Sequence, residues 1–411
     1  MTVLRVLLPA SLALAGLLGS GSPAAASTAS VTQDLRTRLH AALATSTASA
    51  VSAAVDVEGL GSVLRQGSTT SLLPASTEKL YTTFAALKLL GPTDRLLTEL
   101  RATETQNGPY LPGNLYLVGG GDPFLSGGQL DALAGAVRAA GIRRIDGSLV
   151  VDDLRYDAIR RAPGWKTSFV PDESGPLSAL AVDHNQWRRD SAFLTDPGIP
   201  TLARFRMMLA QHGVAVSPAL HRGRTPDGAR LVASHVSASM TAMVRTTAKS
   251  SDNFAAELML KEIGRASSGV GSTAAGAAGV RNVLTSLGVT VGAVSDGSGL
   301  SSRDRETAVA ELSLLSAAQA SDVFPALRDS LPIACQDGTL EHRMCGTAAA
   351  GRAVAKTGTL PGIHALTGFT TTADGHVVRF ALLLSGVTSG SKARAALDAC
   401  VALLSGARTG P

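Results

Sequence analysis

Apolar residues recur at helical spacing in several parts of this chain. Residues 74–87, PASTEKLYTTFAAL, begin with Pro74, which suits the start of a helix, and continue with Leu80, Phe84 and Leu87. These positions fall on one side of a helix, so a buried face is expected there. Further helices are predicted at 32–46, across 239–264 and at the end of the chain.

Alternating apolar and polar residues predict strands near both ends of the chain. The segment SAAVDVEGLGSVLRQG holds two alternating runs around Gly59 and Gly61, which is typical of a hairpin. Near the other end, RAVAKTGTL, IHALTGFTTT and HVVRFALLLSG are predicted to form antiparallel strands. Because helical segments lie between these two groups, we expect one sheet assembled from both ends of the chain.

The pattern changes between about residues 96 and 235. Short strands (GNLYLVGGG, GSLVVDD, ARLVASH) alternate with turns rich in glycine, proline and aspartate, and two amphipathic helices occur at 127–141 and 199–213. We interpret 96–235 as an inserted α/β domain. The flanking parts, 27–95 and 236–411, then form one domain together.

Residues 1–26 are predicted to be a secretory signal peptide. Arg5 provides the positively charged N-terminal region of a signal peptide, and the run from Val6 to Leu18 provides its apolar central region. Ala24-Ala25-Ala26 is a small-residue cleavage site. The alternative is an uncleaved membrane anchor, but the apolar run is interrupted and shorter than the about 20 residues that a span needs. We therefore expect an exported, extracytoplasmic protein of the cell envelope.

Composition and charge narrow the classes of function. The chain has 411 residues, of which 45% are hydrophobic and 17% charged, as in ordinary globular proteins. Loss of 1–26 removes Arg5 and lowers the formal charge from +5 to +4. That small excess suits an anionic wall or membrane surface, although a solvated surface explains it equally simply. No cluster of Lys and Arg is interleaved with aromatic residues, so nucleic acid is not an expected partner.

The chain contains three cysteines, and their spacing does not suit metal ligands. In an oxidising compartment, Cys335 and Cys345 can close a short loop. Cys400 lies in an apolar helical stretch and is expected to be a buried small hydrophobic residue.

A serine and a lysine lie one helical turn apart in the 74–87 segment. Ser76 and Lys79 occupy positions i and i+3, so both project from one face of a helix. A hydroxyl becomes a nucleophile when a base accepts its proton, and a lysine can act as that base once burial lowers its pKa. The alternative is a solvated helix surface. A second S-x-x-K, at 389–392, lies in a Gly/Ser segment that we interpret as a loop unable to align the pair.

Two further motifs change this balance. Ser251-Asp252-Asn253 precedes an apolar helical stretch, and its simplest alternative role is a helix N-cap. Lys356-Thr357-Gly358-Thr359 lies on a predicted strand, where the alternative is an edge-strand lysine with a glycine bulge. Each alternative is reasonable alone, but the three motifs occur in this order and each in a suitable element.

The three motifs together resemble those of penicillin-binding proteins and serine β-lactamases. The segments LYLVGGGDP, DGSGLSSRDR, LPIACQDGTLEHR and AKTGTLPGIHALTGF extend the resemblance. From about residue 30 to 405 the chain is similar to the D-alanyl-D-alanine carboxypeptidase/endopeptidase family of low-molecular-mass, class C penicillin-binding proteins. The resemblance implies an α+β fold: a penicillin-binding/serine β-lactamase-like transpeptidase domain, with an antiparallel sheet between helices, and an inserted α/β domain.

The resemblance also implies roles for catalytic residues. Ser76 would attack the carbonyl between two D-alanines of a peptidoglycan stem peptide and form an acyl-enzyme, with Lys79 accepting the serine proton. Ser251 would relay that proton to the leaving amine, and Lys356 would lend positive charge to the relay. Asn253 would hold the substrate amide.

Substrate-binding residues are implied on the predicted strand at 354–360. Thr357 and Thr359 hydroxyls would bind the terminal carboxylate, and the backbone N–H groups of Ser76 and Thr359 would form the oxyanion hole. Gly358 would let the substrate lie against the sheet edge, because a side chain there would obstruct it. The resemblance calls for no metal or organic cofactor, and it implies that β-lactam antibiotics acylate the protein.

Other motifs are interpreted as supporting structure. DGSG (296–299) is expected to be a structural turn rather than a wall of the cleft, and QDGTL (336–340) a loop near the site. Asp152, Asp153, Tyr156 and Trp165 are weaker candidates for recognising the peptide side chain. Because the span between the first two motifs is short for the family, a third domain is expected to be reduced or missing.

Two other functions compete with a carboxypeptidase. A serine β-lactamase shares the three motifs, but no Glu-x-x-x-Asn segment lies between the first and second to supply a deacylating glutamate. A non-catalytic wall-binding protein on the same fold would have no use for the complete proton-relay set. We therefore predict a secreted serine-type D-Ala-D-Ala carboxypeptidase, with DD-endopeptidase action as a further possibility.

Overall fold

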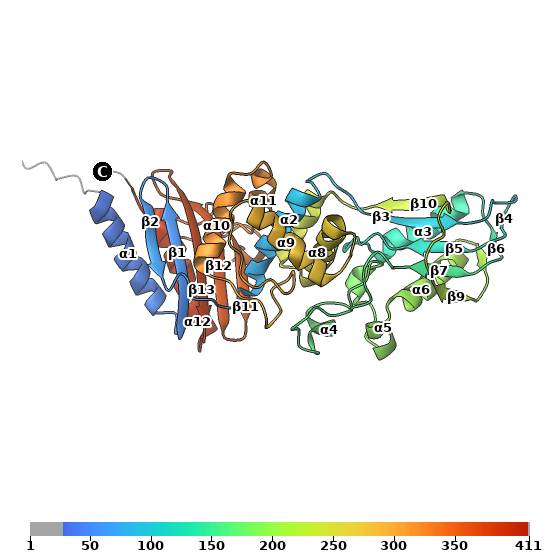
Figure 1. The fold of residues 1–411 in the computed structure, drawn as a ribbon, viewed down its shortest axis with the longest axis horizontal. Helices are drawn as coiled ribbons and strands as arrows, with labels where there is room; N and C mark the ends of the chain where they lie inside the picture. Colours follow the sequence, from blue (N-terminus) through green and yellow to red (C-terminus); the bar gives the residue numbers. More distant parts are fainter. Residues whose placement is uncertain (1–27, 410–411) are drawn as a thin grey trace, which may run out of the picture.

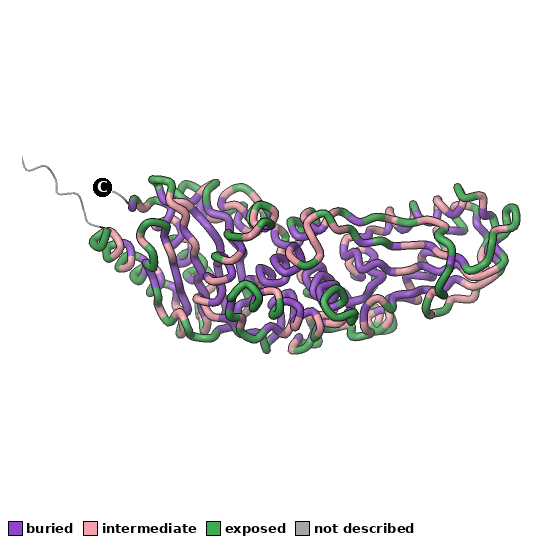
Figure 2. Tube along the Cα trace, turned by 45° about the horizontal axis from the view of Figure 1, so that its top comes forward, coloured by how far each residue is buried: buried purple, intermediate pink, exposed green. Residues whose placement is uncertain are grey.

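The computed structural model describes residues 28–409 of the chain. It is elongated, with one sheet and its helices at one end and a second sheet at the other (Figure 1). Buried residues run through both sheets and through the helices between them (Figure 2). The predicted signal peptide, 1–26, lies outside the described residues, and no helix within 28–409 is long and apolar enough to span a membrane.

The first sheet is antiparallel and joins the two ends of the chain. β1 pairs with β2 on one side and with β13 on the other, and Ala50 faces Ser385 at the end of that register. The prediction of one sheet from both chain ends is therefore confirmed. In spatial order its strands are β11 (Val354–Leu360), β12 (Ile363–Thr371), β13 (Val377–Ser385), β1 (Ala50–Val57) and β2 (Gly61–Gln66).

Helices cover both faces of this sheet. On one face α1 (Thr28–Ala44) and α12 (Gly390–Gly406) bury apolar residues such as Leu39 and Leu397 against the strands. On the other face α10 (Ala308–Gln319) packs through Leu312. The helices beyond it are α2 (Lys79–Leu89), α7 (Met240–Ser250), α8 (Asn253–Ser268), α9 (Thr273–Ser286) and α11 (Phe324–Ser330).

The start of α12 corrects one interpretation from the sequence. The second S-x-x-K, at 389–392, was expected to lie in a loop, but Ser389 is the N-cap and α12 begins at Gly390. The Gly/Ser composition favoured a loop. The helix forms there because Ala393, Leu397 and Val401, at spacings of four residues, are buried against the sheet.

Residues 97–236 build a second, mixed sheet, which confirms the predicted α/β elements. α3 (Gly127–Ala139) and α6 (Gly198–Gln211) pack around one apolar core with its strands. In spatial order these are β10 (Arg230–Val236), β3 (Leu97–Ala102), β5 (Leu115–Val118), β7 (Leu149–Asp152) and β9 (Leu220–Arg222). A small parallel sheet contains β4 (Tyr110–Leu111), β6 (Arg144–Ile145) and β8 (Ala215–Val216). The expected reduction of a third domain stays a prediction.

An irregular segment between β7 and α6 connects this second sheet to the helices of the first. Tyr156 and Leu177 pack against Phe254 and Leu258 of α8. The segment contains α4 (Phe169–Asp172), the short 3-10 turn η2 (Asp183–Asn185) and α5 (Ser191–Thr195). It therefore brings residues of the predicted insertion next to the N-terminus of α8.

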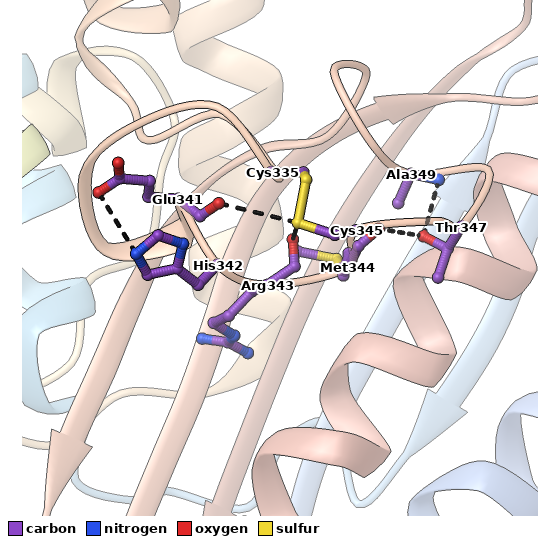
Figure 3. Close-up of a disulfide and its surroundings, with 8 residues drawn as sticks. All are labelled: Cys335, Glu341, His342, Arg343, Met344, Cys345, Thr347 and Ala349. Carbon is purple, nitrogen blue, oxygen red and sulfur yellow. Dashed lines mark hydrogen bonds and ion pairs between the residues drawn. A yellow bond between two sulfur atoms is a disulfide. The ribbon is translucent and has the colours of Figure 1, made fainter.

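A disulfide joins Cys335 to Cys345, with their Cα atoms 4.9 Å apart (Figure 3). It closes the loop that carries the 3-10 turn η3 (Gly338–Leu340). Cys400 is fully buried among the residues that pack α1 and α12 on the sheet. Both expectations for the cysteines are confirmed.

Candidate active site

Ser76 lies on a tight turn and not inside the following helix. The 3-10 turn η1 (Ala75–Glu78) precedes α2, which begins at Lys79. Ala75 has φ +50°, a left-handed conformation that L-residues adopt at a cost of about 1–2 kcal/mol. The backbone of Gly299 packs so closely that a Cβ there would lie 1.9 Å from the Ala75 carbonyl oxygen. Surrounding packing therefore holds this turn in place, with Ser76 half-buried and its neighbours buried.

Lys79 is completely buried beneath Ser76. Its Nζ donates hydrogen bonds to Ser76 Oγ at 3.1 Å, Asn253 Oδ1 at 2.8 Å and the Ser298 carbonyl at 2.6 Å. Burial lowers the pKa of Lys79 to about 8, although nearby carboxyl groups, Asp296 foremost, oppose the shift. An appreciable fraction of Lys79 is therefore neutral near physiological pH. The Ser298 contact corrects our interpretation of DGSG, because this turn forms part of the site.

Ser251 and Lys356 form a second serine–lysine contact. Lys356 Nζ donates to Ser251 Oγ at 2.9 Å and to the Thr357 carbonyl at 3.0 Å. Burial, together with the positive charge of Lys79, lowers the pKa of Lys356 well below its usual value. Both serine hydroxyls of the site are thus paired with a desolvated amine.

The break between α7 and α8 explains how Ser251 becomes available. Ser251 has φ +60° and ends α7, whereas Asp252 is the N-cap of α8 and accepts a hydrogen bond from Ala255 N at 2.9 Å. The capping role that competed with a catalytic one therefore belongs to Asp252. The Ser251 hydroxyl remains free to contact Lys356.

Asn253 connects three segments of the chain. Its Oδ1 accepts a hydrogen bond from Lys79, and its Nδ2 donates to the carbonyl of Glu173 at 3.1 Å. Glu173 follows α4, in the irregular segment between β7 and α6 that packs against α8. The orientation of this carboxamide therefore depends on the predicted insertion.

The edge strand β11 contributes Thr357, Gly358 and Thr359. Thr357 Oγ1 donates to Thr339 Oγ1 at 2.9 Å, and the side chain of Thr359 is exposed. A Cβ on Gly358 would lie 2.6 Å from the Pro74 carbonyl oxygen. The expected role of Gly358 therefore needs correction: its missing side chain lets β11 pack against the turn that carries Ser76, on the protein side of the strand.

These residues line a common cleft of about 770 Å³. Ser76, Ser251, Asn253, Thr357 and Thr359 all face it, so the structure brings the three sequence motifs together. The motifs did not reveal the other residues that line it. Thr339 lies in the QDGTL loop expected near the site. Arg343 and His364 lie in segments that carry the family resemblance but were given no role, and no quoted segment contains Lys166, Phe169, Glu173 or Arg394.

With the geometry known, comparison with other proteins identifies the family. The model of the D-Ala-D-Ala carboxypeptidase 3 (S13) family matches residues 35–198 and 188–406. The chain belongs to this family. The predicted serine-type D-Ala-D-Ala carboxypeptidase is therefore confirmed, and so is the predicted family.

Relatives of this carboxypeptidase cover most of its length. A D-alanyl-D-alanine carboxypeptidase of Actinomadura sp. (strain R39) is 30% identical over 77% of the chain and 73% of the relative. Carboxypeptidase DacB of Mycolicibacterium smegmatis is 32% identical, covering 90% of the chain and 83% of the relative. The crystal structure of penicillin binding protein 4 from Haemophilus influenzae superposes with a TM-score of 0.79 at 22% identity, covering 90% of this chain and 97% of that one. This superposition confirms the predicted fold class.

The four weaker candidates for recognising the peptide side chain all form hydrogen bonds or ion pairs within the protein. Tyr156 donates from its hydroxyl to Glu262 at 3.0 Å, and Asp153 forms ion pairs with two arginines. Asp152 accepts backbone hydrogen bonds within its own region. Trp165 Nε1 donates to Asp296 at 2.6 Å and so connects the irregular segment to the DGSG turn. None of these four side chains lines the cleft in the described part of the chain.

Several buried carboxyl groups lie near the turn that carries Ser76 and Lys79. Burial raises the pKa of Glu257 to about 8 and that of Asp304 to about 10, with the charge of Asp296 contributing to both shifts. The pKa of Glu78 is also raised well above its usual value, chiefly by burial. Raised pKa values favour the neutral forms of these carboxyl groups, which reduces the negative charge of Glu257 and Glu78 near Lys79. The lysine therefore keeps its lowered pKa despite many acidic neighbours.

Proposed function

We propose that this carboxypeptidase removes the terminal D-alanine from peptidoglycan stem peptides through an acyl-enzyme on Ser76. We further propose that it cleaves cross-linked peptides as a DD-endopeptidase. One observation carries the proposal: the amine of buried Lys79 lies 3.1 Å from Ser76 Oγ at the edge of the cleft. This is the contact that a nucleophile and its general base require.

Acylation begins when neutral Lys79 accepts the proton of Ser76. Oγ then attacks the carbonyl between the two D-alanines, and the carbonyl oxygen takes up the electron pair as an oxyanion. The backbone N–H groups of Ser76 and Thr359 stabilise this oxyanion, because both belong to packed elements that need no reorganisation.

Collapse of this intermediate breaks the C–N bond and releases D-alanine. The proton held by Lys79 passes through the hydroxyl of Ser251 to the leaving nitrogen. Lys356, 2.9 Å from Ser251 Oγ, orients that hydroxyl by donating a hydrogen bond to it. A water molecule then hydrolyses the ester on Ser76 and frees the shortened peptide.

Residues along both walls of the cleft hold the substrate in this scheme. Asn253 binds the peptide amide, and the hydroxyls of Thr357 and Thr359 bind the terminal carboxylate. Gly358 acts indirectly, by keeping β11 close to the turn that carries Ser76.

The wider assignments are proposals as well. We propose a catalytic domain of 27–95 with 236–411, an inserted domain of 96–235, export through the 1–26 signal peptide, and action in the cell envelope. We also propose that β-lactams acylate Ser76. The structure of Haemophilus influenzae penicillin binding protein 4 in complex with a β-lactam supports this, because its fold matches that of the present chain.

Labelled penicillin tests the proposal directly. The wild-type protein should become labelled, and Ser76→Ala should abolish labelling while Ser71→Ala, at an exposed serine five residues earlier, retains it. D-alanine release from a pentapeptide should disappear in the same variant. Labelling that survives Ser76→Ala would place the nucleophile elsewhere, and rapid turnover of a chromogenic cephalosporin would indicate a β-lactamase instead.

A further inference from the structure

One end of the cleft is cationic, and the proposed reaction does not use it. Arg343, His364 and Arg394 line this end together with Gly390. His364 lies on β12 directly opposite Thr359 of β11 in the antiparallel register. The cationic end, defined by these three side chains and the start of α12, is therefore adjacent to the threonines proposed to bind the terminal carboxylate.

The start of α12 presents unpaired backbone donors. The side chain of its N-cap, Ser389, makes no capping hydrogen bond. Within 28–409 no acceptor is placed for the N–H groups of Gly390 and Ser391. The N-terminus of a 17-residue helix carries partial positive charge, which favours an anion beside these groups.

His364 provides an independent indication of a ligand. The residue is only 7% exposed, yet neither ring nitrogen has a hydrogen-bond partner among the residues that the structure describes. A Cβ on Gly390 would lie 3.0 Å from its Nε2, so the glycine makes room for the ring. Burial, helped by the charges of Arg394 and Arg343, lowers the pKa of His364. The ring is therefore mostly neutral at pH 7 and keeps one N–H to donate into the cleft.

Of the two arginines at the cationic end, one forms an ion pair and the other does not. Arg343 is paired with Asp398, with Nη2 2.6 Å from Oδ1. Arg394 is exposed and has no ion-pair partner in the described part of the chain. The arrangement thus suits a single anionic group.

We propose that the cationic end binds a second carboxylate carried by the leaving part of the substrate. This inference rests on the proposed function, in which Thr357 and Thr359 hold the first carboxylate. A terminal D-alanine carries only that first one. Among leaving residues with a longer side chain, a dicarboxylic amino acid would therefore be preferred over a neutral one of the same size, because its side-chain carboxylate reaches Arg394, His364 and the α12 N–H groups.

Three N-acylated peptides that differ only in the last residue test this. They end in D-Ala-D-Ala, D-Ala-D-Glu and D-Ala-D-Gln, and D-Gln is nearly isosteric with D-Glu but neutral. For the wild type we expect kcat/KM to be about 10-fold higher for D-Glu than for D-Gln, as a charge-assisted hydrogen bond provides. High salt should reduce this ratio, because Arg394 is exposed.

Two variants of α12 locate the effect. Arg394→Gln should bring the D-Glu/D-Gln ratio to within about twofold of one, since it removes the unpaired charge. Lys392→Gln makes the same change of charge two residues earlier, at an exposed position outside the cleft, and should preserve the ratio.

The outcomes separate this inference from the proposed function. A wild-type ratio near one, a ratio that survives Arg394→Gln, or equal losses in both variants would overturn the cationic end as a carboxylate site. If the wild type still hydrolyses the D-Ala-D-Ala peptide, the proposed function stands without it. If no peptide is hydrolysed, both fail.

Discussion

The amine of Lys356 lies 2.9 Å from the hydroxyl of Ser251, although one residue is on an edge strand and the other ends a helix. Ser251 has φ +60°, so its backbone is held in a conformation that is unfavourable for serine. Surrounding packing maintains that conformation, and the hydroxyl thereby faces the buried amine. The relationship supports proton transfer as the role of this pair.

Ser251→Ala should remove the proton relay and leave the fold intact. We expect acylation by penicillin and hydrolysis of a D-Ala-D-Ala peptide to fall about 100-fold or more, within the range for general acid–base catalysis. Stopped-flow acylation and peptide kinetics measure this. Ser250→Ala is the matched control, because that exposed hydroxyl only bonds back to Thr246 within α7. Equal activity of the two variants would remove Ser251 from the mechanism.

The rate of acylation should rise with pH through about 8. Lys79 must be neutral to accept a proton, and burial lowers its pKa to about 8. Below that pH the neutral fraction, and with it the rate, should increase about tenfold per pH unit, reaching a plateau above it. Acylation rates from pH 6 to 10, with thermal unfolding as a check on the fold, provide the test. A flat profile between pH 7 and 9 would contradict Lys79 as the base.

Gly358→Ala should impair both stability and acylation. The added Cβ would lie 2.6 Å from the Pro74 carbonyl oxygen, so β11 and the turn that carries Ser76 must move apart. We expect a loss of about 1–3 kcal/mol in the free energy of unfolding, as for other overpacked sites. Gly128→Ala, at an open position of α3, should be neutral or stabilising. Denaturant unfolding and penicillin labelling of both variants check this, and a fully stable, active Gly358→Ala would refute the packing role.

Removing the disulfide should weaken both the fold and the binding of substrate. The bridge spans a sequence separation of 10, and closing such a loop stabilises a protein by about 3 kcal/mol in the chain-entropy model. The loop carries Thr339 and Arg343, which line the cleft (Figure 3 shows Arg343), so KM should rise in Cys335→Ser/Cys345→Ser. Reductant should destabilise the wild type similarly and leave the double variant unchanged. Loss of stability on reducing the double variant would point to another cause.

Local patterns were sufficient to predict much of the site. Ser76 and Lys79 are one turn apart, so their contact needs almost no tertiary information. Lys356 and Ser251 were found through motifs. Each motif suggests a catalytic role and also fits a predicted strand or helix. Their contact depends on the path of the chain, which spacing alone does not define.

Other residues could not be found because their roles arise only from packing. Gly358 was assigned to substrate clearance, but its neighbour is the Pro74 carbonyl, which is remote in sequence. Arg343, His364 and Arg394 belong to a loop, a strand and a helix, and share no spacing that a sequence pattern could show. The helical start at Gly390 was missed because burial of the following apolar residues outweighs the local preference of glycine and serine for a loop.

The pairing of β1 with β13 has a consequence for folding during translation. β1 is synthesised early, and one of its edges stays unpaired until β13, near the end of the chain, has left the ribosome. The turn bearing Ser76 is synthesised long before β11, which must arrive to complete it. We therefore expect a nascent or prematurely terminated polypeptide to be inactive, with hydrolytic activity beginning only when synthesis is nearly finished.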